Sequence, residues 1–438
     1  MRETTWFLII GSVFVVMGIA GPMLKRLPCS SAIFYLAIGA ALGTPGAGLL
    51  ALDIFRDAHL LRVLTEVALL VSLFAIGLRL RAPQADPLWS LPLRLGIVAM
   101  LITIPLLTAF GIAVLGLAPG PALLMAAILA PTDPVLAHDV QVHDSRDQDL
   151  MRFALSGEGG LNDGAALPFA LLGIALCVHP DIPLTAALSL SFIANAVWGV
   201  VGAIGIGAVL GWATTHVVAW LRTRHAQGLG LEGFFSLGLI ELSYGTAQLA
   251  HTFGFLSVFA AGVAMRRVEY RASDKRTAQA RIGTLEPEDG QASAAHPDKV
   301  HAYMAESILG FMIELERIAE MATMTVIGNV LTTLPGPLLN GRNALLAATL
   351  FLLVRPLAVE ISLTGSRVSR VQRRLMDWFG IRGIGSFYYT VYAVEHGLRA
   401  GTALVQAVLL AVTASVVVHG ISATPLMNWY QRRRQRHP

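Results

Sequence analysis

One apolar stretch of the chain contains three polar side chains that could do chemistry together. Glu158, Asn162 and Asp163 lie in a run that continues without a charged residue through Cys177. In a helix, Glu158 and Asn162 share a face, whereas Asp163 is offset from Asn162 by about 100°. The two carboxylates are therefore expected to have different partners. In a long apolar segment, ionisable groups are unfavourable and mark a functional site by default.

A second polar group lies earlier in the chain, in a stretch that no continuous helix can cross. Pro131 and Pro134 bracket Thr132 and Asp133 within another apolar run. Because proline lacks a backbone N–H donor, the carbonyls it frees must be satisfied by neighbouring groups or by an ion. The pattern predicts a discontinuous helix. Asp133 would either offset the positive N-termini of half-helices or bind a cation.

Two arginines in the last third of the chain also lie in apolar sequence. Arg355 precedes Pro356 in the middle of an apolar run, where an unpaired guanidinium is unfavourable, so it needs a buried acid. Arg382 is followed by Gly383 and Gly385. This segment fits a second broken helix opposite the first. The alternative is that the two glycines only allow helices to pack closely.

The elements that position these residues must be membrane helices. Only 14% of the 438 residues are charged, against roughly 25% in an ordinary soluble protein. The 32 Lys and Arg and the 28 Asp and Glu are spread among apolar runs, and no basic face forms. We therefore exclude a soluble enzyme, a disordered chain and a nucleic-acid-binding protein. The cysteines, Cys29 and Cys177, provide no disulfide framework and no Cys-ligated metal site.

About thirteen segments are apolar enough to be read as membrane spans, each of which needs about 20 apolar residues as a helix. We place them near 5–23, 27–43, 58–78, 95–117, 121–140, 150–177, 190–219, 231–249, 252–265, 311–334, 344–364, 381–398 and 403–425.

Basic residues follow the odd-numbered segments, as they do in short cytoplasmic loops. They are Lys25, Arg26, Arg79, Arg81, Arg146, Arg152, Arg222, Arg224, Arg266, Arg267 and the arginines of 367–374 and 432–436. This pattern predicts that the N-terminus is outside and the C-terminus is in the cytoplasm. We expect a multi-pass protein of the plasma (inner) membrane.

The chain is expected to divide into two membrane halves. Residues 1–265 form the N-terminal half with the ion-site helices, 266–310 a charged cytoplasmic loop, and 311–438 the C-terminal half with a short basic cytoplasmic tail. Four charged residues near the start of the second half repeat at helical spacing, and we expect them to form solvated or ion-paired turns. They are Glu314, Glu316, Arg317 and Glu320.

Absent motifs narrow the class of membrane protein. The chain has neither the G-x-x-x-x-G-K-[ST] phosphate loop of common ATP-driven pumps nor the H-E-x-x-H of a zinc protease. A channel would need a filter-like run, and an intramembrane enzyme would need a nucleophile beside Glu158 and Asp163. Tyr388, Tyr389 and Tyr392 fit either packing or a proton-coupled organic-solute transporter, which remains the main alternative to an ion exchanger.

Two motifs together resemble the monovalent cation:proton antiporter-1 family, which contains NhaP-type and related sodium/proton exchangers. They are A-P-T-D-P around Asp133 and E-x-x-x-N-D-G from Glu158 to Gly164. The resemblance extends over most of the chain and includes Arg355-Pro356 and the R-G-I-G-S sequence from Arg382. It implies an all-α polytopic membrane protein with about thirteen helices, inverted repeats and two discontinuous helices. It also implies a homodimer embedded in membrane lipids, without a cofactor or a nucleic-acid partner.

The resemblance assigns a role to each polar residue of the two ion-site segments. Asp163 would carry the cation and the proton in turn. Asn162 would hold the break in the fifth segment in place, and Thr132 and Asp133 would line the ion site. Glu158 would form a structural ion pair with an arginine of the eleventh segment, Arg355.

The family pattern also suggests one further candidate residue, Glu66, and this chain departs from the pattern at one position, Gly159. Relatives often place an acid near the ion path in the third segment, which selects Glu66 here; the alternative is a glutamate solvated at the entrance. Many relatives have a serine after the glutamate, where its hydroxyl can join the cation shell. This chain has Gly159 there, so water or another oxygen must replace that hydroxyl.

The expected activity is therefore secondary active transport and not enzymatic catalysis. Ionised Asp163 would bind an alkali cation, with Na⁺ the first choice and K⁺ the second, through the oxygen ligands that hard cations prefer. Protonation would remove that attraction, so the two ligands exclude each other. Because neutral Asn162 stands beside Asp163, one proton charge replaces one cation charge. This predicts electroneutral antiport, which would serve ion and pH homeostasis.

Overall fold

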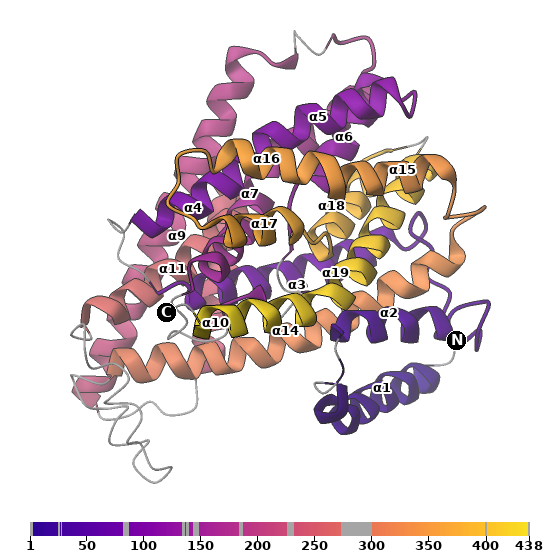
Figure 1. Ribbon diagram of the computed structural model, residues 1–438. Coiled ribbons are helices and arrows are strands. Elements are labelled where there is room, and N and C mark those ends of the chain that lie inside the picture. Colours follow the sequence, from indigo (N-terminus) through magenta and orange to yellow (C-terminus); the bar gives the residue numbers. More distant parts are fainter. Residues whose placement is uncertain are drawn as a thin grey trace.

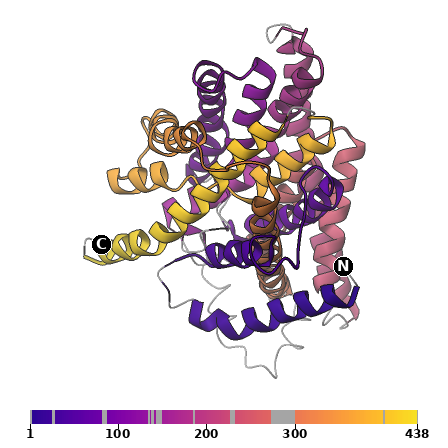
Figure 2. The same cartoon turned by 90° about the vertical axis from the view of Figure 1, so that its right-hand side faces the viewer.

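The computed structural model describes residues 3–24, 27, 29–81, 87–133, 136, 140–142, 149–183, 187–225, 232–272, 300–398 and 401–436. All regular structure in these residues is helical, as the sequence predicts. The helices form one bundle, with the first helix at its edge (Figures 1 and 2).

The helices are α1 (Glu3–Leu24), α2 (Ser31–Leu42), α3 (Ala58–Arg79), η1 (Pro87–Trp89), α4 (Ser90–Leu93), η2 (Arg94–Ala99), α5 (Met100–Ala113), α6 (Pro119–Leu129), α7 (Leu150–Val178), α9 (Leu190–His225), α10 (Glu232–Leu249), α11 (Gly254–Ala272), α14 (Val300–Thr333), α15 (Gly341–Thr349), η6 (Leu350–Val354), α16 (Arg355–Ser362), α17 (Arg370–Trp378), α18 (Ile384–Glu395) and α19 (Thr402–Arg436).

Six helical stretches among the described residues are long and apolar enough to cross a membrane, and α2 and α6 are shorter apolar helices. The six are Ala58–Arg79, Pro87–Ala113, Leu150–Val178, Leu190–Leu221, Gly341–Ser362 and Thr402–Gln435. Each segment placed from the sequence coincides at least in part with a helix.

Several boundaries differ from the sequence-based placement; for example, α19 continues to Arg436, through the basic segment expected as a tail after 425. The segment expected at 121–140 is helical only to Leu129, because the chain reaches the proline-rich break there. The charged loop expected at 266–310 is shorter, since α11 continues to Ala272 and α14 already begins at Val300. Residues 273–299 lie outside the described part of the chain.

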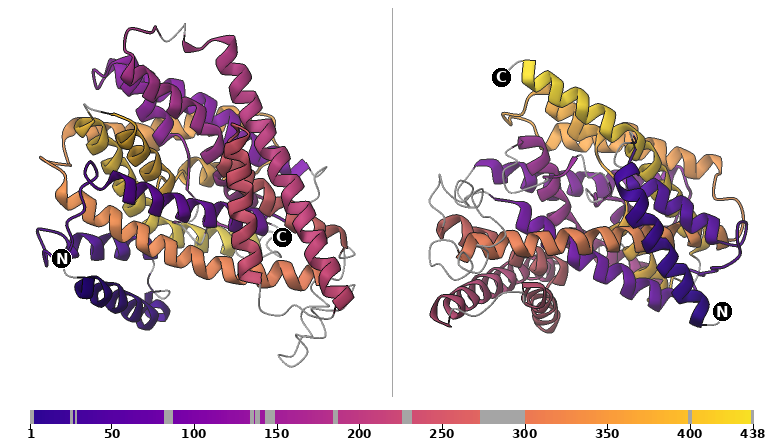
Figure 3. Two further views of the ribbon diagram at one scale, coloured as in Figure 1. Left: turned by 180° about the vertical axis from the view of Figure 1, so that it is seen from behind. Right: turned by 90° about the horizontal axis from the view of Figure 1, so that it is seen from below.

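The helices fall into two sets. In the first, α2 and α3 pack against α14, and α9 and α10 pack against α11; α9 and α11 lie side by side along one flank (Figure 3). In the second, α6 packs between α5 and α7, while α16, α17 and α19 lie nearby. Helices α3 and α18 join the two sets near the centre of the bundle.

The second set repeats one order of elements. A helix with a π-helical turn, a helix that ends in non-helical chain, and a long helix follow one another twice. The first series consists of α4–α5 with η2, then α6, then α7, and the second of α15–α16 with η6, then α17 and α18, then α19. The two non-helical stretches are 130–133 and 379–383. In the described residues, the second stretch interrupts a helix between α17 and α18, and α6 ends where the sequence predicts the first break.

Candidate functional site

The two breaks in the helices meet, and backbone groups join them. The N–H of Asp133 donates to the carbonyl of Ile381 over 2.7 Å. In return, the N–H of Ile384, the first residue of α18, donates to Asp133 Oδ2 over 2.9 Å. A carboxylate at this position satisfies a free N–H and opposes the positive end of the helix dipole. Of the two roles open for Asp133, helix capping is the one visible in its contacts.

Arg382 performs the complementary role at the C-terminal end of α6. Its side chain is fully buried, and its Nε donates to the carbonyl of Leu129 over 2.9 Å. Ser386 Oγ donates to the neighbouring carbonyl of Ile128 over 2.8 Å. Terminal carbonyls carry the negative end of the helix dipole, so a guanidinium is favourable there. Among the described residues, the N-terminus of α18 and the C-terminus of α6 therefore each face a group of opposite charge.

The two glycines near Arg382 allow this close approach. A β-carbon on Gly383 would lie 2.1 Å from Leu136 Cδ1 and 2.6 Å from Asp133 Oδ2. A β-carbon on Gly385 would lie 2.6 Å from Asp163 Oδ1. Both distances to carboxylate oxygens are far below van der Waals contact. The segment is thus a broken helix, and its glycines bring backbone directly against the two aspartates.

Asn162 and Asp163 lie on α7 beside this crossing. Asn162 Nδ2 donates to Thr132 Oγ1 over 2.9 Å, so the side chain ties α7 to the break. Its Oδ1 is buried and accepts no hydrogen bond from the described residues. Asp163 is 5% exposed, and the contacts of its carboxylate with described residues include no hydrogen bond and no cation; Asp133 is close enough to repel it. These acceptors without donors suit a cation or a proton.

The sequence named Tyr389 only as a residue of packing or of an organic-solute site, and did not place it beside Asp163. Its hydroxyl donates to the backbone carbonyl of Asp163. It is buried, as is Tyr388, whose ring packs 5.3 Å from that of Tyr389 and 5.0 Å from that of Phe255. The spacing of aromatic residues after the second break signalled this cluster. These contacts make packing a sufficient role for Tyr388, whereas Tyr389 also supports the backbone of the site.

Glu158 has a complete set of partners five residues before Asp163. Both Nη atoms of Arg355 hydrogen-bond to its carboxylate, with 2.9 Å between Nη2 and Oε2. Arg355 also donates to the carbonyl of Met376 over 3.0 Å. Glu158 and Arg355 are 1% and 4% exposed. This bidentate pair ties α7 to α16 and to the end of α17, and it leaves no free charge.

Glu66 takes part in a different cluster. Its carboxylate pairs with Arg62 one turn earlier on α3 and accepts from the hydroxyl of Tyr244 on α10. Arg62 also pairs with Glu395 at the end of α18, and Glu395 lies 2.8 Å from His59 Nδ1. The cluster joins the two sets of helices. Among the described residues, Glu66 forms no hydrogen bond with the other residues predicted for the ion site.

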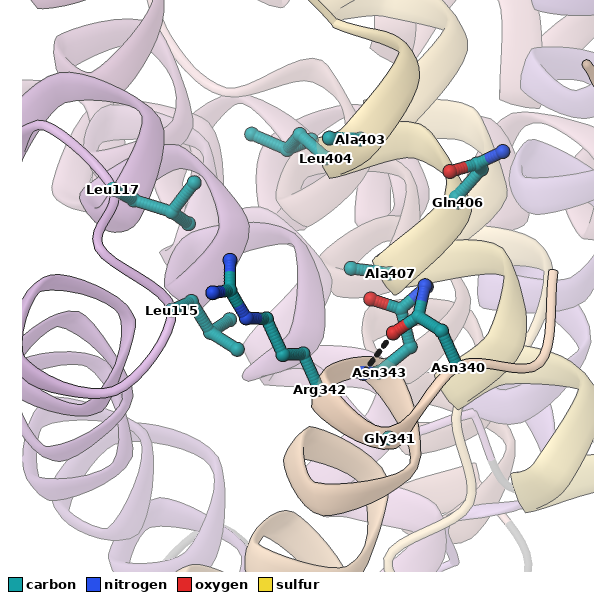
Figure 4. Close-up of a pocket in the computed structure, with 10 residues that line it drawn as sticks. All are labelled: Leu115, Leu117, Asn340, Gly341, Arg342, Asn343, Ala403, Leu404, Gln406 and Ala407. Carbon is teal, nitrogen blue, oxygen red and sulfur yellow. Dashed lines mark hydrogen bonds between the residues drawn. The ribbon is translucent and has the colours of Figure 1, made fainter. Parts of the chain in front are cut away.

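A cavity of about 530 Å³ lies elsewhere, between the turn after α5 and the starts of α15 and α19. Figure 4 shows Arg342 extending between Leu115 and Leu117 on one side and Asn343 on the other. None of the residues predicted for ion binding lines this cavity. The crossing of the two breaks therefore remains the candidate site.

Residues 6–286 match the family model described as "Sodium/hydrogen exchanger, transmembrane". The chain belongs to the sodium/hydrogen exchanger family. This confirms the resemblance inferred from the two motifs. The matched range contains the break at Thr132 and Asp133 as well as the polar segment of α7.

Similar proteins extend the comparison to nearly the whole chain. The K⁺/H⁺ antiporter NhaP2 of Shewanella oneidensis is 26% identical over 428 residues, which cover 95% of this chain and 66% of that protein. The K⁺/H⁺ antiporter NhaP of Alkalimonas amylolytica is 23% identical over 96% of this chain and 66% of its own length. This chain thus spans slightly less than two thirds of these relatives.

The fold matches a solved antiporter. A structure of the sodium proton antiporter MjNhaP1 from Methanocaldococcus jannaschii at pH 8 aligns with a TM-score of 0.69 at 15% identity, over 96% of this chain and 98% of that one. A three-dimensional electron-microscopy map of the same antiporter gives 0.71 at 18% identity, with 98% of each chain covered. The antiporter fold predicted from the sequence is confirmed.

Proposed function

We propose that the protein exchanges an alkali cation, K⁺ or Na⁺, for H⁺ by competition at Asp163. One observation carries the proposal: Asp163 is buried, and among the described residues its carboxylate has no hydrogen-bond donor and no ion-pair partner. The neighbouring Asn162 Oδ1 is buried without a donor as well. Such oxygens need either a proton or a positive ion.

The chain's own residues define the two states of the cycle. Ionised Asp163 binds the cation with Asn162 Oδ1 as a second oxygen ligand, while Thr132 holds the asparagine through its hydrogen bond. Protonated Asp163 is neutral and releases the cation. Asp133 stays occupied with the N-terminus of α18 in both states and contributes mainly by fixing the crossing. Glu158 keeps its arginine throughout and carries neither ligand.

The printed names of the relatives support the class of substrate. NhaP2 of Shewanella oneidensis and NhaP of Alkalimonas amylolytica are named K⁺/H⁺ antiporters, whereas MjNhaP1 is named a sodium proton antiporter. An organic-solute transporter would need a cavity lined by groups that grip a larger ligand. Tyr388 and Tyr389, which suggested that alternative, are instead packed against each other and buried.

The same site predicts electroneutral exchange. Asn162 adds an amide and not a second carboxylate, so one proton charge replaces one cation charge at Asp163. The distribution of basic residues predicts that the N-terminus is outside and the C-terminus is in the cytoplasm of the plasma (inner) membrane. Homodimerisation, which the family resemblance implied, stays a prediction.

Flux in proteoliposomes tests the proposal. A trapped pH-sensitive dye reports proton movement while NaCl, KCl, LiCl or choline chloride is added outside, for the wild type and for Asp163→Asn. We expect saturable proton movement with Na⁺ or K⁺, none with choline, and none in the variant. With Na⁺ as substrate, an imposed membrane potential should leave the rate unchanged.

Three results would contradict parts of this proposal. Alkali cations that move no protons at any pH, with well-folded protein, would reject cation exchange and favour the organic-solute alternative. Cation flux without proton movement would indicate a channel. A sustained current on cation addition would reject electroneutrality alone.

A further inference from the structure

A second buried carboxylate lies outside the site described above. Glu320 is on α14, and its residue is 8% exposed. Its one hydrogen-bond partner among the described residues is Ser31, whose Oγ donates to Oε1 over 3.0 Å. No arginine, lysine or histidine of the described residues forms an ion pair with it. The sequence had suggested a solvated or ion-paired turn for this glutamate, and the structure contradicts that expectation.

Two other acids on α14 differ from Glu320: Glu316 shares its face one turn earlier, and Glu314 lies on an exposed face. Glu316 is also buried, but Arg79 of α3 neutralises it through a close ion pair. Glu314 is exposed and pairs with Arg317 over 2.8 Å. Glu320 lies about 6 Å further along the helix axis than Glu316. It therefore has the burial of Glu316 without the compensating cation.

The position of Glu320 connects it to the crossing of the broken helices. Helix α2 packs along α14 (Figure 1). The serines at its start contact α14 on one side and the chain after the first break on the other. Ser31 binds Glu320, while Ser30 Oγ donates to the carbonyl of Leu136 over 2.6 Å, three residues after Asp133. Asp133 and Glu320 are close enough for their charges to repel.

The charged and titratable neighbours of Glu320 do not neutralise it. They are Tyr35 on α2, Glu316 and Arg317 on α14, and Asp133 at the break. Arg79 from α3 is committed to Glu316, and Arg317 to Glu314. A carboxylate in apolar surroundings with a single hydroxyl donor is unfavourable when ionised and alone. It must hold a proton or attract a cation, as at Asp163.

We propose that Glu320 is a second ligand-carrying carboxylate of the exchange path, which takes up the alkali cation or the proton between the contact of α2 with α14 and the crossing at Asp133. This inference rests on the proposed exchange function. It adds a residue on α14, in the first set of helices, to a site built in the second set. Its role is transient binding and not a covalent step.

Glu320→Gln tests the role, because glutamine preserves size and can still accept from Ser31. Glu314→Gln is the matched control, which removes a carboxylate from the same helix at an exposed position. In proteoliposomes, Glu320→Gln should retain exchange but need about tenfold more cation for half-maximal rate. The dependence of its rate on pH should also change in shape. Glu320→Asp should recover part of the loss, and Glu314→Gln should behave as the wild type.

Each outcome decides between the two proposals. Glu320→Gln with the cation dependence and pH profile of the wild type would reject the role of Glu320 and leave exchange at Asp163 intact. A wild-type protein without cation-dependent proton movement would reject both.

An infrared measurement provides an answer even if Glu320→Gln fails to transport. Purified wild-type protein titrated from low to high pH should lose a carbonyl-stretch component of a protonated carboxyl group that Glu320→Gln lacks and that Asp163→Asn retains. Identical titrations of the wild type and Glu320→Gln would overturn the assignment.

Discussion

Two carboxylates on α7, five residues apart, have opposite environments. Glu158 accepts two hydrogen bonds from Arg355, which is itself held by backbone carbonyls at the end of α17. Asp163 is equally buried but faces the backbone of Gly385 and the repelling charge of Asp133. The same helix thus contains one acid whose charge is compensated by an arginine and one that has no ion-pair partner among the described residues.

This difference separates structural from functional charge. A buried ion pair is destabilising to break, because the remaining partner keeps its desolvation penalty. A buried acid without a partner is a site where the protein gives up stability, and a transported proton or cation can restore it. Breaking the Glu158–Arg355 pair should therefore mainly reduce folding, whereas substituting Asp163 should mainly reduce transport.

The largest effect on transport is expected for Asp163→Asn. Exchange should fall to the level of empty liposomes, because asparagine can neither ionise nor take up a proton. Thermal stability in detergent should be unchanged or higher, since an unpaired buried acid is removed. Dye-based flux and a melting curve on the same preparation check both. Residual exchange above about one tenth of the wild-type rate would break the proposed contrast, because a tenfold loss corresponds to only about 1.4 kcal/mol.

The largest effect on folding is expected for Arg355→Ala. It leaves Glu158 buried without its cation, which should destabilise the protein by about 3–5 kcal/mol. We expect little monodisperse protein on size-exclusion chromatography. The double variant Glu158→Gln/Arg355→Gln should be more stable than Arg355→Ala, because it leaves no isolated charge. Equal yields of Arg355→Ala and wild type would remove the structural role of the pair.

A smaller effect on cation affinity is expected for Gly385→Ala. The new β-carbon would lie 2.6 Å from Asp163 Oδ1, so the carboxylate or the start of α18 must move. We expect roughly tenfold weaker apparent affinity for the cation with folded protein. Gly205→Ala is the matched control, because a β-carbon there meets nothing within 4 Å. Unchanged affinity in Gly385→Ala would show that the close approach is not needed for binding.

The smallest expected effect is on the pH dependence of stability and concerns Asp377 on α17, which has Arg355 among its charged neighbours. Burial, with a contribution from Glu360, raises the pKa of this carboxyl from 3.8 to about 6. A pKa raised by folding contributes stability that is fully present below the unfolded-state value of 3.8 and is lost as the pH rises through about 6. The wild-type melting temperature should therefore drop by a few degrees between about pH 4 and pH 7. Asp377→Asn should reduce that drop, whereas Glu314→Gln should not.

The fold class and the helices were largely predictable from the sequence. Long apolar runs with few charges dictate membrane helices, because lipid leaves no other way to satisfy the backbone. Pro131 and the glycines after Arg382 predicted where two helices break, since these residues remove a donor or allow backbone to approach closely. The family motif also selected Asn162 and Asp163 as residues of the ion site. These properties are local, so a one-dimensional pattern carries them.

Tertiary structure decided which polar groups have partners. Sequence left open whether Asp133 binds an ion or caps a helix, and the N–H of Ile384, 251 positions later, occupies it. Spacing on α14 predicted solvated or ion-paired acids, which holds for Glu314 and Glu316, whereas Glu320 is buried with only Ser31 as a hydrogen-bond partner among the described residues. Burial and ion pairing depend on residues distant in the chain, because charges are compensated by whichever side chains the packing brings within a few ångströms. The family motif had assigned Arg355 to Glu158, and packing brings the two side chains together although they are 197 positions apart in the chain.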